Sequence, residues 1–408
     1  MQKENPERLD EKGNQYFFLK GQNAEKAVQN LAERTFLTDW CYPNPKLPNG
    51  KELCDLLVVF DSMAIIWEIK DLKLGKNGKY KKSEVEENLR HLAGARRQLF
   101  DLRTPIELKN PRRGKELFDP SQITETYLVS VLVGEDEEEY CRIYEEIKNR
   151  PAHVFNRTFT QIILRELDSI SDFCEYLRKK EALMATDRKL FISGGEEELL
   201  AFYLKNAHSF ETIQEANVAF FDGTLWEHLQ NLPEYKAKKK ADEISYVWDS
   251  IIDRAHEGSS QYEIIARELA RTNRFERRCL SKAFYEAQLR AHKDETHNLY
   301  RRYVAGEEVT YCFLFMDEPE PRHKRIRDLK AMVILARGLF PNNKKVVGIA
   351  TGKKMRSECS YDFWFLEKPN WTDDDRKILE DVREKFAILK NPVLVKYNEE
   401  EYPTSDKS

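Results

Sequence analysis

Residues 53–70 read LCDLLVVF (53–60), DS (61–62) and MAIIWEIK (63–70), and this stretch decides the fold. Two apolar runs of strand length flank a polar pair, and they are rich in leucine, valine and isoleucine. Runs of this composition, joined by two polar residues, are typical of a buried β-hairpin. Asp55, Glu68 and Lys70 stand inside these strands, and charged side chains in a segment that should be core require an explanation.

The register of the predicted hairpin brings two carboxylates together. If residues 61–62 form a two-residue turn, Phe60 pairs with Met63, and counting back places Asp55 opposite Glu68. Residues that face each other across an antiparallel pair lie about 5 Å apart, and like charges there destabilise the sheet. Partial burial makes the unpaired arrangement cost still more, so we expect a divalent cation to bind both carboxylates.

The predicted metal site consists of hard oxygen ligands. Asp55, Glu68 and the backbone carbonyl of Ile69 are donors of the kind that Mg²⁺ prefers, and Mn²⁺ is expected to substitute for it. Lys70 points to the same face of the strand as Glu68. We expect Lys70 to orient or deprotonate a water, or to stabilise charge on a phosphate. The alternative is an edge hairpin whose charges are simply solvated.

Glu-x-Lys alone carries little information, because 34% of the residues are charged. The pattern recurs at residues 107–109, 146–148 and 234–236, where we expect neither a buried strand nor an upstream acidic partner. Only the copy that begins at Glu68 follows an apolar hairpin strand that starts with an aspartate. The surrounding hairpin, rather than the Glu-x-Lys pattern itself, distinguishes this copy.

One order of residues resembles that of the PD-(D/E)XK, or restriction-endonuclease-like, nuclease superfamily: Glu25, then Asp55, then Glu68-Ile69-Lys70, then a helix. The resemblance covers roughly residues 15–185. It implies a mixed β-sheet flanked by helices, and metal-dependent hydrolysis of phosphodiester bonds that leaves a 5'-phosphate and a 3'-hydroxyl. It also implies that Glu25, on the helix before the hairpin, completes the metal site as a catalytic residue. Cys54 stands where the family name would put proline, a position that is commonly degenerate.

Basic residues after the hairpin are candidates for contacts with a nucleic-acid backbone. We expect a loop followed by a helix over 83–102, with Ser83 as N-cap and Glu86 completing a capping box. Gln98 on this helix resembles a glutamine that some branches of the family carry. The alternative for the loop is a solvated basic segment. The predicted nucleic-acid-binding residues are Lys73, Lys76, Lys79, Lys81, Lys82, Arg96, Arg97 and Gln98.

The sequence as a whole predicts an α/β protein of three parts. They are a PD-(D/E)XK-like nuclease domain at 1–192, a mainly helical region at 193–305, and a small C-terminal α/β module at 306–408 that serves specificity, partner binding or regulation. Further strands are expected at 126–134, 309–316, 346–350 and 361–366, a mixed strand segment at 153–164, and helices at 140–148, 169–183, 261–292, 326–339 and 373–389.

Composition restricts the setting. The chain has 408 residues, and 67 basic against 71 acidic side chains leave a net charge of -4, so any nucleic-acid contact must come from local basic patches. The seven cysteines form no CxxC pair, which predicts reduced thiols and a cytoplasmic protein. The longest apolar runs are strand-sized, so no membrane span is expected.

These observations predict a metal-dependent nuclease that hydrolyses DNA, in anti-phage defence, restriction or repair. One alternative is a non-catalytic nucleic-acid-binding or scaffold protein with a nuclease-like fold. Another is the same chemistry on RNA, because a basic loop binds either backbone. Besides nucleic acid, a second copy of the chain or a partner protein of a defence system are the partners considered.

Overall fold

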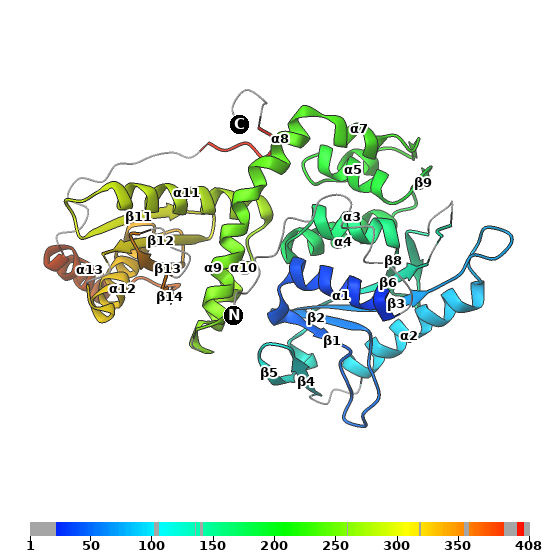
Figure 1. Cartoon of the computed structure of the whole chain (residues 1–408), viewed down its shortest axis with the longest axis horizontal. Helices are drawn as coiled ribbons and strands as arrows, with labels where there is room; N and C mark the ends of the chain where they lie inside the picture. Colours follow the sequence, from blue (N-terminus) through cyan, green and yellow to red (C-terminus); the bar gives the residue numbers. More distant parts are fainter. Residues whose placement is uncertain are drawn as a thin grey trace, which may run out of the picture. The chain divides into compact units, whose positions relative to one another are not determined.

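The computed structural model divides into two compact units, the first ending at Leu232 and the second beginning at Pro233. Both units combine helices with β-sheets, which confirms the predicted α/β class (Figure 1). The boundaries predicted after residues 192 and 305 fall inside these units and stay predictions. The structure describes residues 22–101, 106–134, 136–138, 142–258, 260–317, 320–354, 359–386 and 398–403.

A six-stranded mixed sheet forms the centre of the first unit, in the order β1-β2-β3-β6-β8-β7. Strand β2 is antiparallel to both β1 and β3, the strands β3, β6 and β8 are parallel, and β7 runs antiparallel to β8 at the edge. The strands are β1 (Cys41–Pro43), β2 (Leu56–Phe60), β3 (Met63–Asp71), β6 (Glu125–Val133), β7 (Tyr144–Glu146) and β8 (Pro151–Asn156).

The hairpin β2–β3 has the predicted register. Phe60 pairs with Met63 and Leu56 with Trp67, so the position before β2, Asp55, lies opposite Glu68. Asp61 in the two-residue turn has a φ of 51°, the left-handed conformation that such tight hairpin turns require. The predicted register is confirmed, and with it the juxtaposition of the two carboxylates.

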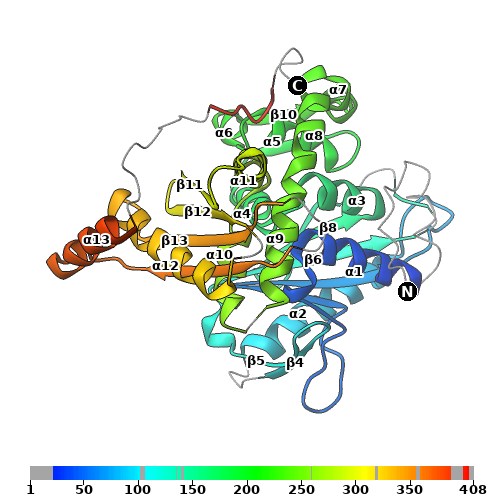
Figure 2. The same cartoon turned by 60° about the vertical axis from the view of Figure 1, so that its left-hand side comes forward.

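Helices cover both faces of this sheet (Figure 2). On one face, α2 (Lys82–Phe100) packs against β3 and β6 and shares its core with the small antiparallel hairpin of β4 (Ile106–Asn110) and β5 (Gly114–Phe118). On the other face, Trp67 stacks on Phe173 with ring centroids 5.7 Å apart. The helices on that face are α1 (Gln22–Phe36), α3 (Arg157–Glu166) and α4 (Ile170–Met184).

The rest of the first unit continues from α4. Buried Lys180 forms an ion pair with buried Glu196, with 2.6 Å between Nζ and Oε1, and so ties α4 to the following segment. That segment contains two parallel strands, β9 (Lys189–Ile192) and β10 (Val218–Phe221), and the helices α5 (Glu197–Lys205), α6 (Glu211–Glu215) and α7 (Leu225–Asn231). The 3-10 helices of the unit are η2 (Thr38–Trp40) and η3 (Pro120–Gln122).

The second unit has its own sheet, in the order β11-β12-β13-β14. Trp248 and Phe284 pack against one face, and α12 covers the other. The strands are β11 (Leu299–Ala305), β12 (Val309–Met316), β13 (Lys345–Gly352) and β14 (Asp362–Glu367). The helices are α8 (Pro233–Asp242), α9 (Tyr246–His256), α10 (Glu263–Ala270), α11 (Arg274–Lys293), α12 (Arg322–Leu339) and α13 (Asp373–Phe386), with the 3-10 helices η4 (Glu243–Ser245) and η5 (Ser260–Tyr262).

Several local predictions are wrong, each for a physical reason. The N-cap of α2 is Lys81 rather than Ser83, because the bridge between Leu74 and Tyr80 closes the preceding loop and lets the helix start earlier. The helix predicted at 140–148 begins outside the described residues, and its described part contains β7, where pairing with β8 overrides helix propensity. The strand segment at 153–164 changes to helix after Asn156, whose side chain caps α3.

Two further differences concern the second unit. The helix predicted at 261–292 is interrupted before Asn273, which begins α11 with a capping box to Glu276. Strand β11 lies in the region predicted to be mainly helical, because pairing with β12 decides its conformation. Among the described residues, no helix is both long and apolar enough to cross a membrane.

Candidate functional site

The two predicted carboxylates lie together at the open end of the β2–β3 hairpin. Asp55 Oδ2 accepts a hydrogen bond from the backbone N–H of Ile69, with 2.5 Å between the heavy atoms. Glu68, opposite Asp55 across the hairpin, is 8% exposed. Leu57, two residues after Asp55, and Ile66, two residues before Glu68, belong to the core shared with α2. Because side chains alternate along a strand, both carboxylates face α2 as well.

Burial dominates the electrostatics of this pair. Burial, and after it the neighbouring charge of Asp55, together raise the pKa of Glu68 to about 9. Burial also raises the pKa of Asp55, to about 6, against the lowering effect of the Ile69 N–H. Near neutral pH the two carboxyls therefore retain about one proton, which removes their mutual repulsion. A cation that binds both must displace this proton.

Lys70 lies on the same face, two residues after Glu68. Its Nζ is 3.3 Å from Oε2 of Glu87 on α2, and about a third of the side chain (34%) is exposed. The ion pair holds the ammonium group beside the carboxylates while leaving it open to solvent and to a ligand. The lysine side chain is thus accessible to solvent.

A buried asparagine fixes α2 above this end of the sheet. Asn88 Nδ2 donates to Ser130 Oγ on β6 at 2.8 Å, and its distance to the backbone oxygen of Glu68 is 3.4 Å. The asparagine is 2% exposed, and the serine is fully buried. Asn88 therefore links the helix, the strand of Glu68 and the neighbouring strand, and so positions Glu87 over Lys70.

Glu25 on α1 approaches from the other side of the hairpin. Its Oε1 accepts hydrogen bonds from Asn44 Nδ2 at 2.6 Å and from Gln29 Nε2 at 3.1 Å. Gln29 Nε2 also lies 2.8 Å from the backbone oxygen of Asp55. Glu25 is thus connected to Asp55 through Gln29, and its charge contributes to the raised pKa of Asp55. Its role as a metal ligand stays a prediction.

The oxygen donors present fit a hard divalent cation by their chemistry. Asp55 and Glu68 supply two carboxylates, and Ile69 turns its N–H, and with it its carbonyl, toward the Asp55 side of the strand. However, within the described ranges no three acidic, histidine or cysteine side chains come close enough together to hold a metal ion. Glu25 accepts hydrogen bonds from Asn44 and Gln29, and the pair that converges here consists of Asp55 and Glu68.

The predicted basic residues divide into two groups. Five lysines lie exposed in the loop between β3 and α2 or in the first turn of α2, next to the hairpin end that carries Lys70: Lys73, Lys76, Lys79, Lys81 and Lys82. Of these, Lys81 and Lys82 have acidic neighbours on α2, at 3.5 and 3.6 Å. All five follow Lys70 in the chain, in the segment that joins β3 to α2.

The second group lies at the opposite end of α2. Arg96, Arg97 and Gln98 begin nine residues after Glu87, which corresponds to about 14 Å along the helix. Arg97 is exposed, Gln98 is half-buried, and Arg96 lines a separate hollow. The structure therefore does not bring these three residues to the carboxylate pair.

Sequence reasoning missed Glu87, Asn88 and Gln29. Asn88 occupies a position of the apolar stripe of α2, between Val85 and Leu92, and a polar residue there was the signal that could have found it. The partner of Glu87 depends on tertiary packing, which no local pattern encodes.

Comparisons of the chain with protein-family models, with curated proteins and with solved structures gave no match. The resemblance to PD-(D/E)XK nucleases therefore rests on the residues quoted above and on their geometry.

Proposed function

We propose that the first unit is a Mg²⁺-dependent nuclease with a restriction-endonuclease-like core, which hydrolyses phosphodiester bonds of DNA. One observation carries the proposal. Two acidic side chains, Asp55 and Glu68, face each other in a largely buried position at the end of a hairpin, with Lys70 on the same face. Burying two facing acids costs free energy even when they retain a proton, and a cation that binds both would account for the arrangement.

Each residue has a distinct role in this proposal. Asp55, Glu68 and the Ile69 carbonyl would hold Mg²⁺, which supplies charge neutralisation and an acidified water. Lys70 stabilises the charge of the phosphate or holds a proton at Nζ, and Glu87 orients it through their ion pair. Glu25 acts through Gln29 on the backbone of Asp55.

The five lysines of the β3–α2 loop and the first turn of α2 support a polyanionic substrate. They are exposed and adjacent to Lys70, so they can bind backbone phosphates without reading sequence. A cytoplasmic setting in anti-phage defence, restriction or repair belongs to the same proposal, and so does a role of the second unit in specificity, partner binding or regulation.

The test is cleavage of supercoiled plasmid, linear duplex, single-stranded DNA and RNA by the full chain in Mg²⁺, Mn²⁺ or EDTA. We expect DNA cleavage that requires the metal and leaves 5'-phosphates. Glu68→Ala and Lys70→Ala should each reduce the rate by about 100-fold or more, since each removes charge stabilisation from the reacting phosphate.

Glu107→Ala and Lys109→Ala are the matched controls, because they alter the same pattern on an exposed strand face. Both should cleave like the wild type. Cleavage of RNA but not of DNA would show that the substrate of the proposed nuclease is RNA. Cutting that survives Glu68→Ala would reject the site, and a wild type that cuts nothing with any metal would favour a non-catalytic binding protein.

A further inference from the structure

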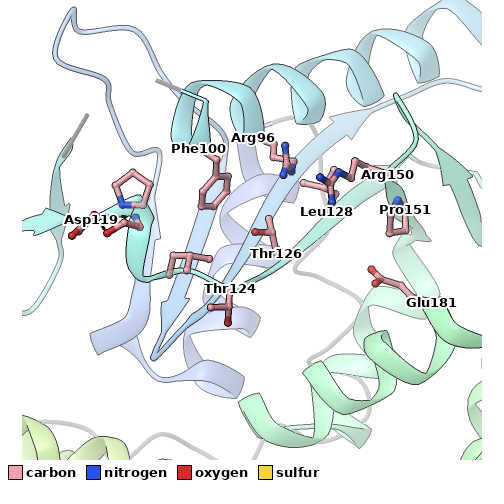
Figure 3. Close-up of a pocket in the computed structure, with 12 residues that line it drawn as sticks. Arg96, Phe100, Asp119, Thr124, Thr126, Leu128, Arg150, Pro151 and Glu181 are labelled. Atoms are coloured by element: carbon pink, nitrogen blue, oxygen red, sulfur yellow. Dashed lines mark hydrogen bonds between the residues drawn. The ribbon is translucent and has the colours of Figure 1, made fainter. Parts of the chain in front are cut away.

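The first unit contains a hollow of about 680 Å³ at the end of α2 that is remote from the carboxylate pair (Figure 3). Its walls come from α2, from β6, from the loop before β6 and from the turn before β8. Thr126 lies on β6 four residues before Ser130, the strand neighbour of Glu68, which corresponds to about 13 Å along the strand. The hollow and the carboxylate pair of Asp55 and Glu68 are therefore two separate places on the same sheet.

Two guanidinium groups converge over this hollow, those of Arg96 and Arg150 (Figure 3). Burial lowers the pKa of Arg96, and the nearby positive charge of Arg150 lowers it further. The charge of Asp101 opposes this effect in part. Among the described residues, neither arginine forms an ion pair with a carboxylate. Two like charges that no ion pair neutralises favour an anion between them.

The backbone of Arg150 belongs to a tight turn. The backbone N–H and C=O groups of Ile147 and Arg150 form reciprocal hydrogen bonds of 2.8 and 3.0 Å around a tight turn. Lys148 and Asn149 in this turn have positive φ angles, as a two-residue hairpin turn requires. The turn therefore fixes the backbone from which the exposed Arg150 side chain extends over the hollow.

Other groups in the hollow fit the same kind of ligand. The hydroxyl of Thr126 lies below the two guanidinium groups in Figure 3 and can donate to a phosphate oxygen. The carboxylate of Asp119 already accepts hydrogen bonds from the N–H and hydroxyl of Ser121. Burial raises the pKa of Glu181 to about 7, so this acid carries only a partial charge near neutral pH.

The hollow also has an apolar side and is larger than an inorganic anion needs. Phe100, Leu128 and Pro151 line it beside the arginines. Its volume lies in the range of sites that enclose small organic molecules, and an aromatic ring next to a cationic end suits a base attached to a phosphate.

We propose that this hollow binds a nucleoside phosphate, with the phosphate between Arg96 and Arg150 and the base against Phe100. The site goes beyond the proposed nuclease function and does not depend on it, because none of its residues belongs to the carboxylate pair. A ligand bound there would contact the far end of α2, the helix whose other end carries Glu87.

The test is isothermal titration of the full chain with adenosine 5'-monophosphate in EDTA, which excludes binding through a metal at Asp55 and Glu68. We expect one binding site per chain. Arg96→Ala and Arg150→Ala should each weaken binding by about tenfold or more, because each removes a charge-assisted contact to the phosphate. Phe100→Leu should weaken binding of the nucleotide but not of inorganic phosphate.

Arg90→Ala is the matched control, since it removes the same charge from an exposed position of the same helix, and it should bind like the wild type. Glu68→Ala should also bind normally, which separates this site from the proposed catalytic one. Circular dichroism of each variant verifies its fold. No binding at millimolar nucleotide, binding that survives both arginine substitutions, or inorganic phosphate binding as tightly as the nucleotide would each overturn the proposal.

Discussion

Two copies of Glu-x-Lys lie on strands of the first unit, at residues 68–70 on β3 and 107–109 on β4. On β3 the glutamate is 8% exposed and faces Asp55. On β4 the glutamate side chain is 60% exposed, and Nζ of Lys115 lies 2.6 Å from it. Strand β4 is buried on one face only: Ile106 and Leu108 belong to the core, while Glu107 and Lys109 are exposed.

The two copies differ in the burial and in the charged neighbours of their glutamate side chains. Water and a lysine satisfy the charge on β4, so its glutamate needs nothing more. On β3, burial and an opposing carboxylate leave a charge that only a proton or a cation can compensate. A short charged pattern therefore becomes informative when its side chain faces the core and another acid.

The largest expected contrast between the copies is in metal binding. Mg²⁺ or Mn²⁺ at 100 times its dissociation constant should stabilise the wild type by about 2.7 kcal/mol. Glu68→Ala should lose this stabilisation, and Glu107→Ala should keep it. Thermal unfolding with and without metal measures both. Equal shifts in the two variants would mean that the cation binds elsewhere.

A smaller contrast concerns the buried asparagines that pin each strand. Asn88→Ala leaves the Ser130 hydroxyl without its partner and should cost about 1–3 kcal/mol of unfolding free energy. Asn110 donates to backbone oxygens of the η2–β1 segment, so Asn110→Ala should cost a similar amount. Only Asn88→Ala should also reduce the stabilisation by metal. Denaturant unfolding with and without Mg²⁺ distinguishes the two variants. If Mg²⁺ stabilises Asn88→Ala and Asn110→Ala equally, Asn88 does not position the metal site.

The pH dependence of stability comes next when it is expressed per pH unit. The pKa of Glu68 is higher in the folded than in the unfolded chain, so the folded state binds the extra proton. Without metal, raising the pH from about 5 to 9 should therefore destabilise the wild type relative to Glu68→Gln, by at most about 1.4 kcal/mol per pH unit. Glu107→Gln should follow the wild type. Parallel pH profiles of wild type and Glu68→Gln would show that the glutamate titrates normally.

The smallest effect is expected at the exposed copy. Lys115→Ala removes the partner of Glu107, but both side chains are largely exposed and water replaces the interaction. Its melting temperature and its response to Mg²⁺ should be indistinguishable from those of the wild type. A measurable loss of stability would show that β4 depends on this pair.

Local patterns accounted for the hairpin and for much of the helix content. The two-residue turn fixed the register, and this made the facing of Asp55 and Glu68 accessible from residue counting alone. The edge strand β7 could not be predicted from the sequence, because three residues carry too weak a signal and their partner strand decides the conformation. Glu87 and Arg150 join their sites through the packing of distant segments, so their contributions required the structure.

The carboxylate pair is local in sequence, whereas its burial is not. Asp55 and Glu68 meet across a two-residue turn, but the sheet that encloses them needs β6, whose first pair joins Met63 to Glu125. In a growing or refolding chain the hairpin can therefore form while both acids are still hydrated and repel each other weakly. The charge conflict arises only when the later strand and α2 dock. Docking is then the folding step that takes up a proton, and a divalent cation favours the same step by replacing that proton.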